Sequence, residues 1–233
     1  VGGAAVGTEK AWSYAGKNKV GRMFVVNQMD RENANFSKVT DQLRATYGAS
    51  VVPMLLPMGE GLSFKGVVNV LEGKAYEGAG KALKEVSVPA AMSAQISAAL
   101  EELTEAAASA DDDLMMKYLD EGELTHEELL SGLQAGMKNG SIVPVCACSA
   151  LTGVGVAPMM DIMAKYLPSP EGVVAAGVNP KTEEEETRTC SDEDPFSALV
   201  YKTIADPFVG KLSLFRVCSG TLTASTALYN VNT

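Results

Sequence analysis

The stretch Met23–Asp30, MFVVNQMD, runs from four apolar residues into an amide and ends on a carboxylate. Residues 22–26 are rich in β-branched and aromatic side chains and predict a buried strand. A helix is expected from Arg31 to a stop at Gly48, with an apolar face formed by Phe36, Val39, Leu43 and Tyr47. In open α/β sheets, ligands bind where strand carboxyl ends meet the following loops. The loop at residues 27–30 is therefore a candidate binding loop.

A second stretch repeats this arrangement further along the chain. Residues 141–148, SIVPVCAC, predict another buried strand, and Ser149, Ala150 and Leu151 follow it. A helix is then expected to end at Pro168, with an apolar face formed by Met159, Ile162, Met163, Tyr166 and Leu167. If the two strands are neighbours in one sheet, the two loops leave the same edge.

The side chains of these loops are suited to reading guanine. The carboxylate of Asp30 can accept hydrogen bonds from N1–H and from the exocyclic amine of guanine, a donor pair that adenine lacks. The Asn27 amide can contact the base edge and tie the loop down, and the Ala150 N–H can donate to guanine O6. Ser149 could hold Asp30 in place. The alternative is that Asn27 and Asp30 only form a turn and a helix N-cap.

The region between these two stretches has a different pattern. Residues 50–86 carry prolines and glycines between short strands and predict a small β-element inserted into the α/β pattern. A helical block follows, with Thr125 and Glu128 placed as a capping box for its last helix. The apolar positions of the block are Met92, Ile96, Ala99, Leu100, Leu103, Ala107, Leu114, Met115, Tyr118 and Leu119. The helix near the amino terminus is expected to be capped by Thr8.

The last part of the chain predicts a linker and then strands. Residues 169–194 are rich in Pro, Gly and Glu, and include a run of glutamates at 183–186. An all-β pattern begins at Pro195, with strands expected at 196–204 and 211–217.

Other motifs give weaker signals. Residues 75–82, AYEGAGKA, resemble a phosphate-binding loop, but position 82 is Ala and cannot supply the hydroxyl that ligates magnesium. We interpret them as an ordinary turn. His126 is interpreted as a surface residue at the start of a helix. Cys146 and Cys148 are expected to be buried thiols on one strand face rather than metal or redox ligands.

Composition narrows the class of protein. A chain of 233 residues with 46% hydrophobic residues can bury a core, and a net charge of −10 argues against wrapping nucleic acid. Residues 139–160 carry no charge, but their prolines and glycines argue against a membrane span. With no signal peptide evident and four irregularly spaced cysteines, a reducing cytoplasmic setting is expected.

Long collinear stretches resemble bacterial elongation factor G, the translational GTPase that drives translocation on the ribosome. They are NQMDRENANF, VVPMLLPMGEGLSFKGVVNVLEGKAY, DDDLMMKYLDEGELTHEEL, SALTGVGVAPMMDIMAKYLPSP and DPFSALVYKTIADPFVGKLSLFRVCSGTL. The resemblance implies an α/β fold: the C-terminal part of a P-loop GTPase domain at 1–48 and 141–168, with an α+β subdomain inserted at 49–140. A linker at 169–194 and the beginning of a β-barrel second domain at 195–233 would follow.

The resemblance also implies site residues and partners. Asn27, Gln28 and Asp30 match the guanine-specificity motif Asn-Lys-x-Asp, and Ser149, Ala150 and Leu151 match the later Ser-Ala-x motif. GTP and GDP would be the ligands, with Mg²⁺ bound alongside the nucleotide only in the full-length protein. A monomer that binds the ribosome is expected. Its stalk protein would be contacted by acidic residues of the insert, namely Glu101, Glu102, Asp111, Asp112, Asp113, Glu127 and Glu128; the alternative for these is a solvated helical face.

Two departures from the family pattern affect what is expected. The family's phosphate-binding loop, switch regions and catalytic histidine would all precede Val1, so this segment alone is expected not to hydrolyse GTP. Gln28 stands where the family has Lys, which favours weaker nucleotide binding or an elongation factor G-like paralogue. A further alternative is a non-enzymatic interaction module that uses the acidic insert and binds little or no nucleotide.

Overall fold

The chain forms two compact units, residues 1–168 and residues 169–233. The structure is a computed structural model that describes residues 2–179 and 182–231. Each unit is described by itself.

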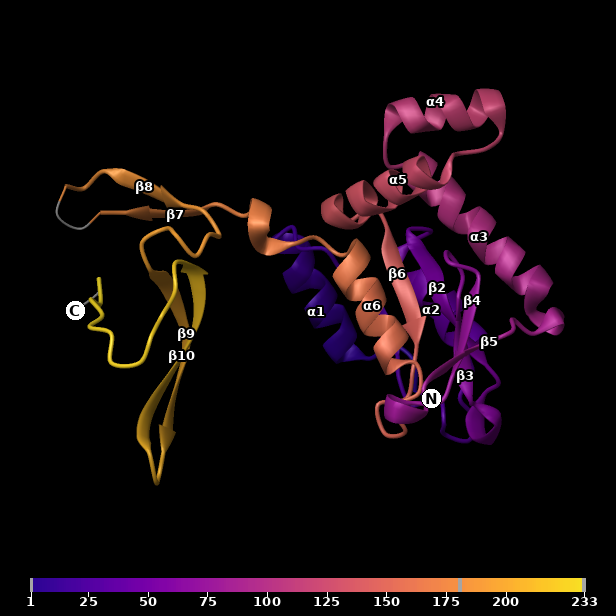
Figure 1. The fold of residues 1–233 in the computed structure, drawn as a ribbon, viewed down its shortest axis with the longest axis horizontal. Coiled ribbons are helices and arrows are strands. Elements are labelled where there is room, and N and C mark those ends of the chain that lie inside the picture. Colours follow the sequence, from indigo (N-terminus) through magenta and orange to yellow (C-terminus); the bar gives the residue numbers. More distant parts are fainter. Residues whose placement is uncertain (1, 180–181, 232–233) are drawn as a thin grey trace. The chain divides into compact units, whose positions relative to one another are not determined.

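The first unit is built of both helices and strands (Figure 1). Its α-helices are α1 (Val6–Lys17), α2 (Phe36–Tyr47), α3 (Ser93–Ala108), α4 (Asp112–Glu121), α5 (His126–Asn139) and α6 (Val156–Tyr166). Its strands are β1 (Phe24–Val26), β2 (Val51–Met58), β3 (Gly66–Asn69), β4 (Lys74–Glu77), β5 (Lys84–Val86) and β6 (Val143–Ala147). Short 3₁₀ turns are η1 (Gly61–Ser63), η2 (Gly80–Ala82) and η3 (Ala90–Met92).

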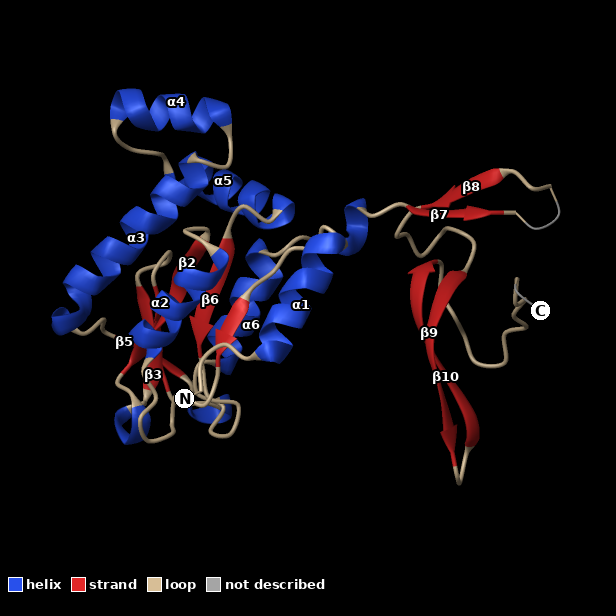
Figure 2. Ribbon diagram, turned by 180° about the vertical axis from the view of Figure 1, so that it is seen from behind, coloured by secondary structure: helices blue, strands red, loops and turns tan. Residues whose placement is uncertain are grey.

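The strands form one six-stranded sheet in the order β1-β6-β2-β3-β4-β5. β1, β6 and β2 run parallel, and β3, β4 and β5 continue the sheet antiparallel from β2. The strands of residues 50–86, expected as a small β-element inserted into the α/β pattern, thus belong to the same sheet as β1 and β6. Helices α6 and α2 lie on opposite faces of it, as the two opposed views of Figures 1 and 2 show.

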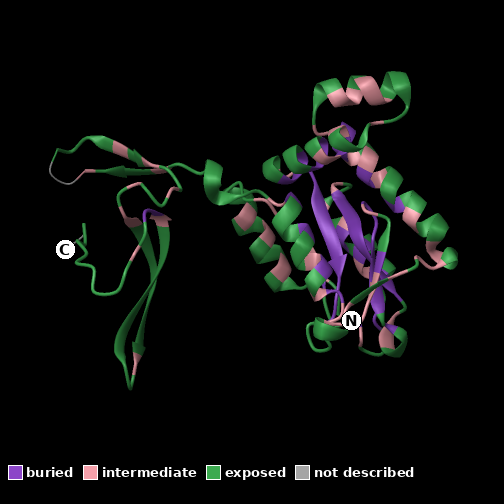
Figure 3. Cartoon of the chain, viewed as in Figure 1, coloured by how far each residue is buried: buried purple, intermediate pink, exposed green. Residues whose placement is uncertain are grey.

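The core lies in the middle of this sheet, where the buried residues concentrate (Figure 3). All eight residues of β2 and all five of β6 are buried, as expected for parallel strands with helices on both faces. β1 was predicted to be buried too, but it is the last strand of the sheet among the described residues, and only its Val26 is buried while Val25 is 42% exposed. Cys146 and Cys148 are buried free thiols, as predicted.

Helix α2 begins later than the sequence suggested. It starts at Phe36 and not at Arg31, because the side chain of Asn35 accepts the Lys38 N–H at 2.7 Å and caps the helix. Residues 31–34 form a turn instead, in which the Ala34 N–H donates to the Arg31 carbonyl. The alternative interpretation of Asp30 as a helix N-cap is therefore wrong.

The helical block divides where the sequence suggested continuity. α3 ends at Ala108, and the side chain of Asp111 accepts the N–H groups of Asp113 and Leu114 to begin α4. At the first helix of the chain, Thr8 is not the N-cap: α1 begins at Val6, and the Thr8 hydroxyl accepts the Ala5 N–H. The capping box of Thr125 and Glu128 at the start of α5 is confirmed.

The capping box gives a pH-dependent prediction. Glu128 accepts hydrogen bonds from Lys117 Nζ at 2.7 Å and from the Thr125 N–H at 2.9 Å, and these contacts lower its pKa to about 2. A carboxylate whose pKa is lowered by folding stabilises the fold above its unfolded pKa of 4.5, and this stabilisation is lost as pH falls towards 2. We expect Glu128→Gln to lower the melting temperature at pH 7 and to have a much smaller effect near pH 2.

Thermal unfolding of the Glu128→Gln variant and of the unchanged protein between pH 2 and pH 7 measures how the difference in melting temperature depends on pH. Glu127→Gln, at the exposed neighbouring position, is the matched control and should change the melting temperature little at either pH. An equal fall in melting temperature for Glu128→Gln at pH 2 and at pH 7 would contradict the role given to this carboxylate.

The second unit contains two hairpins. β7 (Ala175–Val178) pairs with β8 (Glu185–Arg188), so residues 169–194, expected as a linker, carry a short hairpin after the 3₁₀ turn η4 (Pro170–Gly172). β9 (Ser197–Asp206) pairs with β10 (Gly210–Ser219), close to the two strands predicted there. Both strands keep most of their residues exposed, including Leu199 and Val217. Closure of a barrel stays a prediction.

Candidate functional site

The two loops singled out from the sequence leave neighbouring strands at the same edge of the sheet. β1 and β6 pair in parallel, with Val26 opposite Ala147. Their carboxyl ends therefore point the same way, and residues 27–30 lie beside residues 148–151. The structure brings together the two stretches that are far apart in the sequence, as the strand pattern predicted.

Backbone hydrogen bonds fasten the first loop to the second. The Cys148 N–H donates to the Val26 carbonyl at 3.0 Å, and the Met29 N–H donates to the Cys148 carbonyl at 3.2 Å. The Met29 side chain is completely buried in the core. The loop is thus held on both sides of Gln28, and Asp30 follows directly after the buried anchor.

Asn27 bridges the two loops through its side chain. Its Oδ1 accepts the Ala150 N–H at 2.9 Å and the Gln28 N–H at 2.7 Å. The expectation that Asn27 ties the loop down agrees with these contacts. The Ala150 N–H was expected to donate to a ligand. In the structure it donates to the side-chain oxygen of Asn27 instead.

Ser149 has a different position from the one expected. It is fully buried, its Oγ accepts the Thr152 N–H at 3.2 Å, and its own N–H donates to the Val154 carbonyl at 2.9 Å. No hydrogen bond joins it to Asp30 in the described part of the chain, so the expectation that it holds Asp30 in place is wrong. Ser149 shapes its own loop, and Leu151 beside it is 85% exposed.

Asp30 has an acceptor without a protein donor. Its Oδ1 is closed off from solvent and accepts no hydrogen bond within the described residues. Buried acceptors in folded proteins are almost always satisfied, and leaving one unpaired costs about 1–3 kcal/mol, more for a charged group. The described residues therefore leave hydrogen-bonding capacity of the Asp30 carboxylate unused, as they also do for Arg22 Nε and the hydroxyls of Thr40 and Tyr47.

Gln28 is held in an unusual backbone conformation between these anchors. Its φ is +64°, in the left-handed region that non-glycine residues seldom occupy, and its side chain is exposed. The side chain at position 28 is free to reach a ligand bound at the loop.

Hollows in the surface show where a ligand could lie. One of about 310 Å³ is lined by residues 2–4 and 8, by β1, and by Asn27 and Gln28. A larger hollow of about 470 Å³ lies at the opposite end of the parallel strands, next to Ser50 and Ser141. Asp30 lines neither, so we place the site by the loop contacts and not by cavity size.

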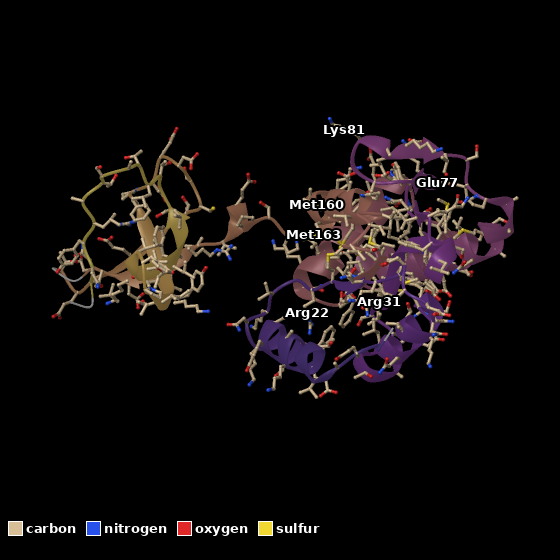
Figure 4. The ribbon with its side chains drawn as sticks, turned by 90° about the horizontal axis from the view of Figure 1, so that it is seen from below. Arg22, Arg31, Glu77, Lys81, Met160 and Met163 are labelled. Carbon is tan, nitrogen blue, oxygen red and sulfur yellow. The ribbon has the colours of Figure 1, made fainter. Side chains whose placement is uncertain are left out.

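The other sequence candidates are not part of these loops, although Ala79 of the look-alike segment lies against Gly153. The phosphate-loop look-alike at 75–82 consists of the end of β4, a turn and the 3₁₀ turn η2, which leads into β5 and not into an α-helix. Figure 4 shows the Lys81 side chain pointing outward, away from Arg31, which follows Asp30. The interpretation as an ordinary turn is confirmed, and His126 is exposed, as predicted.

The buried cysteines are not activated for chemistry. Burial raises the pKa of Cys146 to about 12 and also raises the pKa of Cys148, which disfavours the reactive thiolate form. Among residues 2–179 and 182–231, no three His, Cys, Asp or Glu side chains group as metal ligands. No described helix is long and apolar enough to cross a bilayer.

One structural contributor to the site was missed from the sequence. The turn after β2 contacts the loop at residues 27–36 through Glu60 and Gly61. The other two loops were identified as polar turns that follow the carboxyl end of a parallel strand. The same criterion would have identified the turn after β2 if β2 had been placed beside β6.

Comparisons with known proteins show which family the chain matches. Residues 1–169 match the family described as the elongation factor Tu GTP-binding domain. The chain is also similar to a crystal structure of a protein from Thermus thermophilus, with 30% sequence identity and a TM-score of 0.77. That match covers 94% of this chain but only 30% of the other.

Proposed function

Because the chain belongs to the translational GTPases, in the family of the elongation factor Tu GTP-binding domain, we propose that the loops at 27–30 and 149–151 bind the guanine base of GTP and GDP. The observation that carries this proposal is the meeting of the two loops at the carboxyl ends of β1 and β6, where Asp30 follows the buried Met29 and its Oδ1 has no donor within the described residues. The N1–H and exocyclic amine of guanine would supply donors to this carboxylate.

The neighbouring contacts support the same ligand. Asn27 Oδ1 accepts the Ala150 N–H at 2.9 Å, so the polar groups of these two residues are fixed at one place beside Asp30. On nucleotide binding, the Ala150 N–H would turn from Asn27 Oδ1 to guanine O6, which adenine lacks. Guanine is then distinguished from adenine at two positions of the base.

Competition binding to the full-length protein tests the proposal. GDP, IDP and ADP would each be titrated against a fluorescent GDP. We expect ADP to compete at least about 100-fold more weakly than GDP, because a site built to accept N–H groups rejects a base that cannot donate them. Equal competition by ADP and GDP would contradict guanine recognition and would favour an interaction module that does not read nucleotide.

Position 28 provides a further prediction. A lysine there has a longer alkyl stem to lie along the base and a charge to face the nucleotide phosphates, whereas Gln28 is shorter and neutral. Gln28→Lys is expected to tighten GDP binding by about 1 kcal/mol, which is roughly fivefold. Both side chains must adopt the same left-handed backbone, so the backbone strain is unchanged.

Isothermal titration calorimetry with GDP measures this effect. Gln95→Lys, an exposed position on α3, is the matched control, since it adds the same charge elsewhere on the surface. Equal affinities of the Gln28→Lys variant and the unchanged protein would contradict the role given to position 28.

The wider role that we propose is GTP-driven translocation on the ribosome, as in an elongation factor G or a paralogue of it. Hydrolysis and Mg²⁺ binding would need the full-length protein, and residues 1–233 alone are expected to be inactive. The acidic helices α3–α5 would meet the ribosomal stalk. Glu102 and Glu128 are paired with Arg44 and Lys117, and Asp111 caps α4. The exposed acidic residues left for a partner are Glu101, Asp112, Asp113 and Glu127.

A further inference from the structure

The turn at residues 59–63, between β2 and β3, lies against the loop that carries Asp30. β2 is parallel to β6, so its carboxyl end reaches the same edge of the sheet as the two base-binding loops. The Gly61 N–H donates to the Met29 carbonyl at 2.9 Å. The Glu60 carboxylate accepts the Phe36 N–H at 2.7 Å.

These two hydrogen bonds lie on either side of Asp30 in the sequence. Met29 comes immediately before Asp30, and Phe36 is the first residue of α2. The Glu60 carboxylate satisfies one of the N–H groups that a helix leaves unpaired at its start, and its charge is favoured there by the helix dipole. The segment from 29 to 36 is thus pinned to the turn at both ends.

The turn is itself fixed in shape, which makes it a firm support. The Ser63 hydroxyl donates to the Glu60 carbonyl at 2.8 Å, and the Glu60 N–H donates to that hydroxyl oxygen at 3.1 Å. Gly59 has a φ of +82°, and a Cβ there would lie 2.2 Å from the Ser63 carbonyl oxygen. Only glycine allows the chain to fold this tightly.

From these contacts we infer that the turn at 59–63 positions the Asp30 carboxylate, with Glu60 as the positioning residue, and so sets how strongly the site selects the exocyclic amine of guanine. This inference rests on the proposed function. Met29 is also held from the other side by the Cys148 carbonyl. Asp30 therefore depends on two supports, and loss of the Glu60 contact loosens one of them.

The ratio of IDP to GDP dissociation constants in the full-length protein tests this role. IDP keeps N1–H but lacks the exocyclic amine, so the ratio reports the contact of Asp30 with that amine. Glu60→Ala is expected to lower the ratio by about fivefold, because the charged hydrogen bond to the amine depends on its alignment. Glu60→Gln keeps an oxygen that accepts the Phe36 N–H and should keep the ratio within about twofold of the unchanged protein.

A purely structural role would give a different result. It would lower the melting temperature or weaken GDP and IDP equally, and an unchanged ratio in Glu60→Ala would overturn the inference. If Glu60→Ala does not fold, Glu60→Asp takes its place, because it withdraws the carboxylate by one methylene. A lowered ratio of IDP to GDP dissociation constants in that variant supports the inference, and an unchanged ratio overturns it. An unchanged protein that does not prefer GDP to IDP would overturn the proposed function as well, so the two failures are distinguishable.

Discussion

Replacing Asp30 by asparagine is expected to change the preferred base from guanine to xanthine. The carboxylate accepts two N–H groups, whereas an amide offers one acceptor oxygen and one NH₂ donor. Xanthine has N1–H but carries a carbonyl in place of the exocyclic amine, so it matches the amide. For guanine, the amide NH₂ would face the exocyclic amine, and one charged hydrogen bond would be lost outright.

The expected size of the effect is large. Hydrogen bonds to charged groups contribute about 1.5–3 kcal/mol each, and the asparagine variant weakens both contacts of guanine with position 30. The affinity for GDP should fall by at least about 100-fold, and XDP should bind the variant more tightly than GDP does. Titration of both proteins with GDP and XDP measures the change.

A matched substitution controls for the lost charge. Asp41→Asn removes a carboxylate from the exposed face of α2, outside the two loops, and should leave GDP binding nearly unchanged. If the Asp30→Asn variant binds GDP as tightly as the Asp41→Asn variant, Asp30 does not read the base.

The second large effect is expected at Gly155, which precedes α6 and ends the loop that holds Ser149 and Ala150. Its φ is +77°, and a Cβ there would lie 2.7 Å from the Ala147 carbonyl oxygen and 3.2 Å from Cys148 Cα. Gly155→Ala therefore combines an unfavourable backbone conformation with a collision against β6. We expect it to lower the free energy of unfolding by at least about 2 kcal/mol and the melting temperature by roughly 4–8 °C.

Gly73→Ala separates these two causes. Gly73 also has a positive φ, +62°, but a Cβ there would meet nothing within 4 Å. Its substitution should cost only about 1 kcal/mol, the conformational part. Urea denaturation of both variants measures the difference. Equal losses at the two positions would mean that the close approach of Gly155 to β6 does not constrain the loop.

The sequence predicted strands at 22–26 and 141–148, close to the observed 24–26 and 143–147, and the adjacency of their loops, because apolar runs and turn residues are local signals. It did not predict that β2 lies between β6 and β3. Pro53 and Pro57 argue against a central strand, since proline removes a ladder hydrogen bond. β2 accommodates Pro53 through a register shift against β6 between Pro53 and Leu55, a feature that depends on the partner strand.

The site shows the same division between local and tertiary information. Asn27 and Asp30 were predicted from residue type and position; the structure brings their loop beside the second one, and their contact with a base stays a prediction. The hydrogen bond of Asn27 to Ala150 and the inward turn of Ser149 depend on how the two loops meet, and the delayed start of α2 depends on competition between Asn35 and Asp30 for the helix cap. Single-sequence patterns do not resolve such competition.

The most direct test of guanine recognition is a crystal structure of the full-length protein with GDP bound. We predict that the Asp30 carboxylate accepts N1–H and the exocyclic amine of the base at hydrogen-bonding distances of about 2.7–3.2 Å, with the Ala150 N–H turned to O6. A base bound elsewhere, or an Asp30 carboxylate that meets only protein donors, would contradict it.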